Sequence, residues 1–134
     1  TAAARPAEAA VFRLFEAGYD PRDVLSVNGR APVAPVASTE EAAIARGADA
    51  LAYGGQVHLT VEADDPEAFE AVVSTAREEH GRPLGGVFDD AEWDFSEVAV
   101  GVFGPAQVTV NVVNGPTRVL GDTDEDALAE SFGL

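Results

Sequence analysis

Hydrophobic residues recur with a helical period near the start of the chain. Between residues 7 and 17 they are Ala7, Ala10, Val11, Leu14 and Phe15. Residues spaced in this way lie on one face of a helix, and Gly18 follows where a left-handed cap commonly ends one. The pattern predicts an amphipathic helix over residues 7–17.

A second helical stripe lies in the middle of the chain. Its hydrophobic residues are Phe69, Val72, Val73 and Ala76. Asp65 is a typical N-cap, Pro66 suits the first helical position, and Gly81 follows the stripe. One long helix is therefore predicted from residue 66 to about residue 80.

Other stretches alternate between apolar and polar residues, which is typical of strands with one buried face. The predicted strands are residues 50–53, 56–62, 98–103, 107–113 and 117–120. Gly54-Gly55 would join the first two as a hairpin, and Asn114-Gly115 is a two-residue hairpin signal between the last two. Gly104-Pro105 separates residues 98–103 from residues 107–113. A small mixed or antiparallel sheet follows from this pattern.

The remaining segments are shorter or less regular. In residues 25–37, Asn28-Gly29 suggests a turn, and two prolines favour a structured loop or an edge strand. Ser38 and Glu41 fit a capping box for a short helix ending near Gly47, and Thr123 or Asp124 would cap a last helix through Ser131. Residues 83–95 are predicted as a loop with one helical turn. Because helices and hairpins do not alternate as βαβ units, the predicted class is α+β, with two longer helices and a short C-terminal one.

The net charge of the chain indicates the kind of environment in which the protein works. The chain has 24 acidic residues against 8 basic ones, all arginine, and a net charge of −16. Salt at molar concentration shortens the screening length to about 3 Å and suppresses such self-repulsion. We therefore expect a protein adapted to a salty cytoplasm. A nucleic acid partner is not expected, because there is no basic stripe to bind phosphates.

Size and residue usage indicate one globular domain over residues 1–134. No stretch approaches the roughly 18 apolar residues that span a bilayer, so no membrane association is expected. Without cysteine the chain cannot supply a thiol nucleophile or a Cys-ligated metal. Methionine is also absent, and because the chain starts at Thr1 within a helical pattern, we expect that sequence is missing upstream.

Few residues suggest chemistry when taken one at a time. His58 is predicted on the outward face of a strand and His80 at a helix C-terminus, and neither has a ligand-spaced partner, so no metal site is expected. The glycine pairs at 54–55 and 85–86 do not fit a nucleotide-binding pattern. They are expected to be turns or places where a ligand approaches the backbone.

Arg5 and Glu8 stand three residues apart and would share one face of the first helix. Spacing alone allows two interpretations. The pair is either a solvated ion pair, which contributes little to stability, or a carboxylate acting as general base beside an arginine that orients it. Spacing does not decide between the two.

Several motifs occur in a characteristic order along the chain. They are the run at residues 27–37, Tyr53-Gly54-Gly55, Phe103-Gly104-Pro105-Ala106 with its following strand, and residues 131–134. Together they resemble the C-terminal part of methenyltetrahydromethanopterin cyclohydrolase. Members of that family carry an Arg-x-x-Glu pair, which registers on Arg5 and Glu8, although Pro6 requires the helix to start or bend there.

The resemblance implies hydrolysis of the methenyl bridge of a one-carbon-loaded pterin to the formyl derivative. Glu8 would activate the water and Arg5 would position Glu8 and the intermediate. No metal or cofactor is implied, and the substrate would be a tetrahydromethanopterin or a tetrahydrofolate derivative. Substrate-binding residues are predicted where small residues admit a ligand, at Asn28-Gly29 and Tyr53-Gly54-Gly55.

The family also uses a lysine from its N-terminal half, and this chain has none. The chain alone is therefore expected to be inactive, with the N-terminal half completing the cleft within a homotrimer. The alternative is a noncatalytic binding or assembly module that keeps the same fold. Burial of Arg5 and Glu8 away from any concave surface would favour that alternative.

Overall fold

The protein is described from a computed structural model, which covers residues 5–32, 34–35, 37–98 and 100–133. Four strands form one mixed sheet in the order β1-β2-β3-β4. They are β1 (Val24–Arg30), β2 (Gln56–Val61), β3 (Gln107–Val112) and β4 (Thr117–Gly121). The central pair β2 and β3 is parallel, and both outer pairs are antiparallel. Together with the helices this confirms the α+β class.

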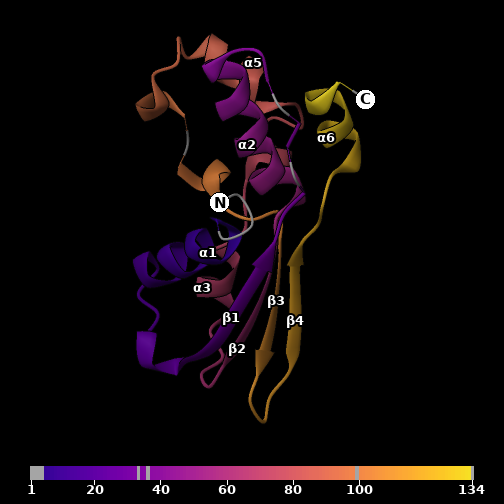
Figure 1. The fold of residues 1–134 in the computed structure, drawn as a ribbon. Coiled ribbons are helices and arrows are strands. Elements are labelled where there is room, and N and C mark those ends of the chain that lie inside the picture. The colour runs from indigo at the N-terminus through magenta and orange to yellow at the C-terminus, as the bar shows by residue number, and fades with distance from the viewer. Residues whose placement is uncertain (1–4, 33, 36, 99, 134) are drawn as a thin grey trace.

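The helices lie in two groups (Figure 1). They are α1 (Arg5–Glu16), α2 (Glu40–Gly54), α3 (Pro66–Glu70), α4 (Ala76–Glu79), α5 (Leu84–Asp90) and α6 (Glu125–Phe132). In Figure 1, α1 and α3 lie to one side of the sheet, whereas α2, α5 and α6 lie beyond its upper end. The two longest helices are α1 and α2, and not the predicted helix at residues 66–80.

One hydrophobic core lies between the sheet and α1 with α3. The strands contribute alternate residues such as Val57, Leu59 and Val110, and the helices contribute Leu14 and Phe69. All five side chains are fully buried. Because neighbouring residues of a strand point to opposite faces, this packing covers one face of the sheet only.

A second core joins the helices beyond the sheet. Tyr53 of α2 and Phe88 of α5 are fully buried in it, together with Leu84 and Val102. Phe88 and Phe103 stack with their ring centroids 6.1 Å apart. Residues 98–103, predicted as a strand, contribute to this core from a 3-10 helix (Val100–Phe103) within the described part. That prediction was wrong, because the segment closes against the helices and not against the sheet.

The prediction of one long helix over residues 66–80 was also wrong, because the middle of this segment is not helical. It divides into α3 and α4, although the start capped by Asp65 is confirmed by a bond from the Ala68 amide to its carboxylate. The break is at Ser74, whose amide donates to Pro105 O at 2.8 Å instead of to the preceding helical turn. The Ser74 hydroxyl donates to Val102 O and accepts from the Ala76 amide. Tertiary hydrogen bonds therefore replace the helical ones here.

Helix α2 overturns two predictions at once. It runs through Gly47 to Gly54, so residues 50–53 are helical and form no strand or hairpin with residues 56–62. Alanine-rich sequence favours a helix, and one glycine costs only about 1 kcal/mol relative to alanine. Its N-cap is Thr39, whose hydroxyl accepts from the Ala42 amide, and not Ser38.

Smaller differences concern loops. Asn28 and Gly29, predicted as a turn, lie inside β1, which is the edge strand also considered for residues 25–37. Residues 84–90 form α5 where one helical turn within a loop was predicted. A hairpin joins β3 and β4 as predicted, with Asn114 at a φ of 59°, but its connection runs over residues 113–116 and is not the two-residue turn expected from Asn114-Gly115. Asp124 caps α6 by accepting from the Ala127 amide.

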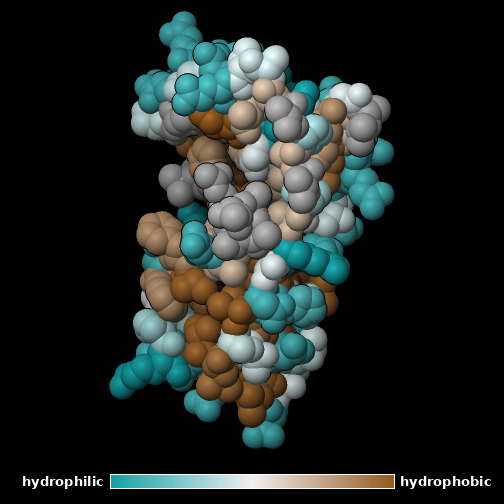
Figure 2. Space-filling view, viewed as in Figure 1, coloured by the Kyte–Doolittle hydropathy of each residue, from teal (hydrophilic) through white to brown (hydrophobic). Residues whose placement is uncertain are grey.

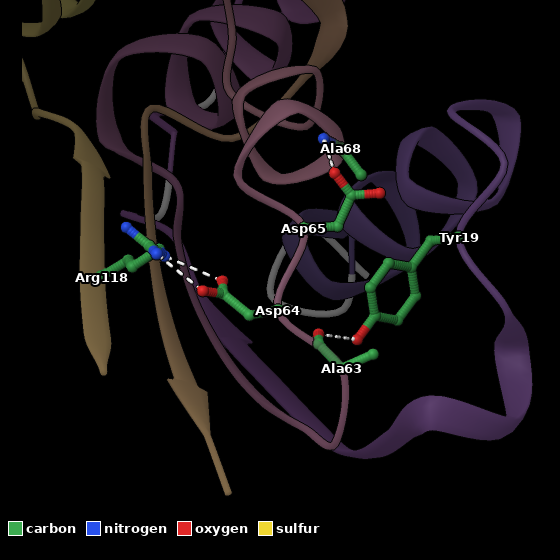
Figure 3. A network of polar contacts seen from close by, with 6 residues as sticks. All are labelled: Tyr19, Ala63, Asp64, Asp65, Ala68 and Arg118. Carbon is green, nitrogen blue, oxygen red and sulfur yellow. Dashed lines mark hydrogen bonds and ion pairs between the residues drawn. The ribbon is translucent and has the colours of Figure 1, made fainter. Parts of the chain in front are cut away.

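Polar contacts fix the connection from β2 to α3 (Figure 3). Tyr19 donates its hydroxyl to Ala63 O at 2.5 Å, and Arg118 of β4 donates to both carboxylate oxygens of Asp64 at 2.8 and 2.6 Å. These bonds from Arg118 hold the pKa of Asp64 below its usual range. The connection is thereby tied to the segment that follows α1 and to β4.

Candidate active site

Glu8 lies on the outward face of α1, at a shallow apolar groove of about 400 Å³. The described residues that line the groove are Ala7, Glu8, Val11, Phe12, Phe15 and Val27, and among them Glu8 is the only charged one. Phe12 is 64% exposed and Phe15 40% exposed. Figure 2 shows hydrophobic atoms gathered where α1 and the strands lie. The arrangement places one carboxylate at the rim of an apolar surface.

Arg5 begins α1, one turn before Glu8. Its backbone is helical, and its side chain lies outside the part of the chain that is described. Glu8 is exposed and forms no ion pair with any described residue. The helix starts at Arg5, directly before Pro6, which agrees with the constraint that proline places on helix entry.

Gly29 determines how closely α1 approaches the sheet. A Cβ atom added to Gly29 would lie 3.0 Å from the Ala7 nitrogen and 3.2 Å from Pro6 Cβ. Both distances are shorter than ordinary van der Waals contact. A side chain at Gly29 would therefore crowd the first turn of α1, which carries Glu8, where it packs on β1. This role of Gly29 could not be recognised from the sequence, because α1 and β1 pack through tertiary contacts.

Asn28 lies on the other face of the sheet. It pairs with His58 of β2, whereas Gly29 pairs with Val57 of the buried face. Since successive strand residues alternate between faces, Asn28 points away from the face that α1 covers. The structure therefore does not bring Asn28 and Glu8 to the same surface.

Tyr53 is fully buried at the end of α2. Its hydroxyl donates to Arg82 O at 2.5 Å, with Ala76 O at 3.5 Å, and burial raises the pKa of Tyr53 to about 12. The side chain is thus occupied in holding α2 to the segment around α4 and α5. Substrate contact at Tyr53 stays a prediction.

Gly54 and Gly55 make the junction from α2 to β2. A Cβ at Gly54 would lie 2.7 Å from Pro32 Cδ, and one at Gly55 would lie 2.6 Å from Leu51 O. Gly55 O also accepts from the Gln107 amide, which starts the parallel pairing of β2 with β3. Other parts of the chain therefore occupy the space around these glycines. Their predicted contact with substrate stays untested.

Asp49 is a buried carboxylate that sequence reasoning missed. It accepts from the Leu84 amide at 2.8 Å and from the Ser131 hydroxyl at 2.5 Å, linking α2 to α5 and α6. Burial is the main cause that raises its pKa to about 6, against the lowering effect of both hydrogen bonds. The sequence does show an acidic residue flanked by alanines, which would suggest a buried position on a helix. It was missed because the helix was predicted to end at Gly47, before Asp49.

Comparison with known proteins decides the family. Residues 1–132 match a family described as Cyclohydrolase (MCH). The chain is also 58% identical, over its whole length, to methenyltetrahydromethanopterin cyclohydrolases from two strains of Halobacterium salinarum. The chain belongs to the cyclohydrolase family.

Relatives named methenyltetrahydromethanopterin cyclohydrolase also occur in methanogen genera. The chain is 38% identical over 98% of its length to that of Methanocella arvoryzae and 34% identical over 96% to that of Methanospirillum hungatei. It spans 43% of the Halobacterium proteins and 42% of these two. The similarity to Halobacterium proteins supports the salt adaptation expected from the acidic composition, and it supports an archaeal source.

Among the described residues, no three His, Cys, Asp or Glu side chains are grouped so that they could hold a metal ion. His58 is exposed on β2 and His80 is exposed at the C-cap of α4, as their sequence positions predicted. No helix in the described ranges is long and apolar enough to cross a membrane.

Proposed function

We propose that this chain forms part of an enzyme that hydrolyses the methenyl bridge of a methenyl-pterin to the formyl derivative. The exposed carboxylate of Glu8 at the rim of the apolar groove carries the proposal. The substrate's reacting carbon belongs to a cationic amidinium. The edges of its pterin ring are polar, but its aryl ring and the flat faces of its ring system can pack against apolar side chains. A groove with one anionic group suits both properties.

The proposed reaction needs a base and a positioned water. The water oxygen adds to the methenyl carbon while Glu8 accepts a proton from the water. One carbon–nitrogen bond of the adduct then breaks, the leaving nitrogen takes up a proton, and the carbon remains on the other nitrogen as a formyl group. Arg5, one turn from Glu8, would orient the carboxylate and stabilise the adduct.

The chain supplies only part of this enzyme in the proposal. It spans 43% of the Halobacterium relatives, and the lysine implied by the family resemblance has no counterpart here. We therefore propose that the remaining part completes the substrate cleft, that the enzyme is a cytoplasmic homotrimer, and that the isolated chain is inactive. The relatives are methenyltetrahydromethanopterin cyclohydrolases, which favours tetrahydromethanopterin over tetrahydrofolate as the carrier.

The test follows the absorbance of a methenyl-pterin with the complete enzyme, comparing Glu8→Gln with Glu16→Gln. Loss of a general base lowers the rate by about 10²–10⁴-fold, so Glu8→Gln should lose activity on that scale. Glu16 lies at the other end of the same helix and should tolerate the change. Full activity of Glu8→Gln refutes its role as base. No hydrolysis by the unaltered enzyme favours the noncatalytic module.

A further inference from the structure

One face of the sheet has no helix over it in the described part of the chain. Its central positions are Gln56, His58 and Thr60 on β2, paired in register with Gln107, Thr109 and Asn111 on β3. The opposite face carries Val57, Leu59 and Val110 and is covered by α1 and α3. The polar face is called the open face below.

The open face continues across both outer strands. It includes Ser26, Asn28 and Arg30 on β1, and Thr117, Val119 and Gly121 on β4. Three positions on each of four strands thus lie on it, and none is Asp or Glu. Its ionisable groups are Arg30 and His58, and Val119 is 62% exposed. Arg30 donates to Gln56 Oε1 and Gln56 Nε2 donates to Gln107 Oε1, forming a row of polar side chains across three strands.

This composition is unusual for the protein that carries it. The chain has 24 acidic residues and a net charge of −16. In such a protein, acidic side chains keep solvent-facing surfaces hydrated in salt. Depletion of charged residues is instead characteristic of interface cores, where like charges brought together cost several kcal/mol. The open face therefore has the composition of a contact surface and not of a solvent surface.

The size of the face indicates what kind of partner covers it. Four strands about 4.8 Å apart and about six residues long give a plane of only about 350 Å². A stable interface between separate proteins buries about 800 Å² on each partner, because association has a large entropic cost. A segment joined covalently avoids most of that cost. The relatives carry more than half of their length outside the region that this chain matches.

We propose that the open face is the surface on which the remaining part of the same polypeptide packs. The covering segment would be poor in carboxylates over the centre of the sheet and would place an acceptor, such as a carboxylate, against Arg30. Nucleic acid does not fit, because the face has one arginine and no lysine. A lipid surface does not fit a face of amides and hydroxyls. This inference is independent of the catalytic role proposed for Glu8.

The first experiment measures access to the open face in the full-length protein. The variants His58→Cys and Thr109→Cys are treated with a maleimide, and the modified peptides are quantified by mass spectrometry. Ala43→Cys, at an exposed position of α2, is the matched control. Labelling of the two sheet variants should be slower than that of the control by about tenfold or more in the native protein. After denaturation the rates should be equal. Native rates equal to the control overturn the proposal.

A second experiment identifies the covering segment. A photoreactive phenylalanine replaces Val119, whose exposed position accepts a larger side chain. The expected crosslinked product runs on a denaturing gel with the mass of a single polypeptide. The crosslink should join residue 119 to a residue of the full-length protein outside residues 1–134. A product of twice that mass assigns the face to a second copy and overturns the proposal. A crosslink back into residues 1–134 also overturns it. Neither experiment depends on catalytic activity.

Discussion

The backbone nitrogen of Ala7 lies 3.0 Å from the position that a Cβ atom would occupy on Gly29. This contact sets the height of the first turn of α1 above β1. It also sets the place of Glu8, which belongs to that turn. A glycine in a strand, far from Glu8 in sequence, thus positions the proposed base.

Replacing Gly29 with valine should displace α1. Overpacking of this kind costs about 1–3 kcal/mol of unfolding free energy, and the complete enzyme should lose kcat as Glu8 moves. Gly47→Ala is the control, since a Cβ there meets nothing within 4 Å in the interior of α2. It should be neutral or stabilise by up to about 1 kcal/mol. Urea unfolding and turnover measure both effects, and unchanged values for Gly29→Val contradict the prediction.

Asp49 should make stability depend on pH. Burial raises the pKa of Asp49 in the folded protein to about 6, above the ordinary value of 3.8. The stability that the neutral carboxyl contributes is therefore present below pH 4 and is lost as the pH rises through 6. Compared with Asp49→Asn, the unaltered protein should lose about 2–3 kcal/mol of unfolding free energy between pH 4 and pH 7. Chemical unfolding at several pH values measures the difference.

Ser131→Ala provides the companion test at Asp49. Removing the hydroxyl that donates to Asp49 Oδ2 should destabilise the charged carboxylate more than the neutral one. The cost should therefore be larger at pH 7 than at pH 4. Parallel pH curves for the unaltered protein, Asp49→Asn and Ser131→Ala would show that Asp49 does not titrate in this range.

Tyr53→Phe should distinguish a structural role from substrate contact. The variant leaves Arg82 O without its buried hydroxyl donor, and this should lower the unfolding free energy by about 1–2 kcal/mol. The KM of the complete enzyme should not change, because the side chain is fully buried. A raised KM with unchanged stability would instead support the contact predicted from the sequence.

Salt should stabilise the protein strongly. The net charge of −16 repels itself over a screening length of about 8 Å at 0.15 M salt but only about 3 Å at 1 M. The melting temperature should rise with potassium chloride, by about 4 °C for each kcal/mol recovered. Sucrose at matched osmolality is the control. An equal rise in sucrose would show that charge screening is not the cause.

Local patterns in the sequence were sufficient to predict several helices, strands and turns. The hydrophobic stripe of α1, the alternation of β2 and β3, and the turn at Asn114-Gly115 all depend on residues close in sequence. The ordered motifs were sufficient to identify the family, and the comparisons with known proteins confirm that identification. The same patterns pointed to Glu8 but could not tell whether it was exposed beside a groove.

Tertiary structure decided what local patterns could not. Hydrogen bonds from Ser74 to residues near Pro105 divide the predicted helix at residues 66–80, and packing against α5 and α6 keeps residues 50–53 helical. The packing of α1 against Gly29 and the hydrogen bonds of the buried Asp49 likewise join segments that are far apart in sequence. The acid-free open face emerges only when four strands are in register. Hydrophobic periodicity predicts which residues share one face of a helix or strand. It does not predict what packs against that face, because those contacts join residues far apart in sequence.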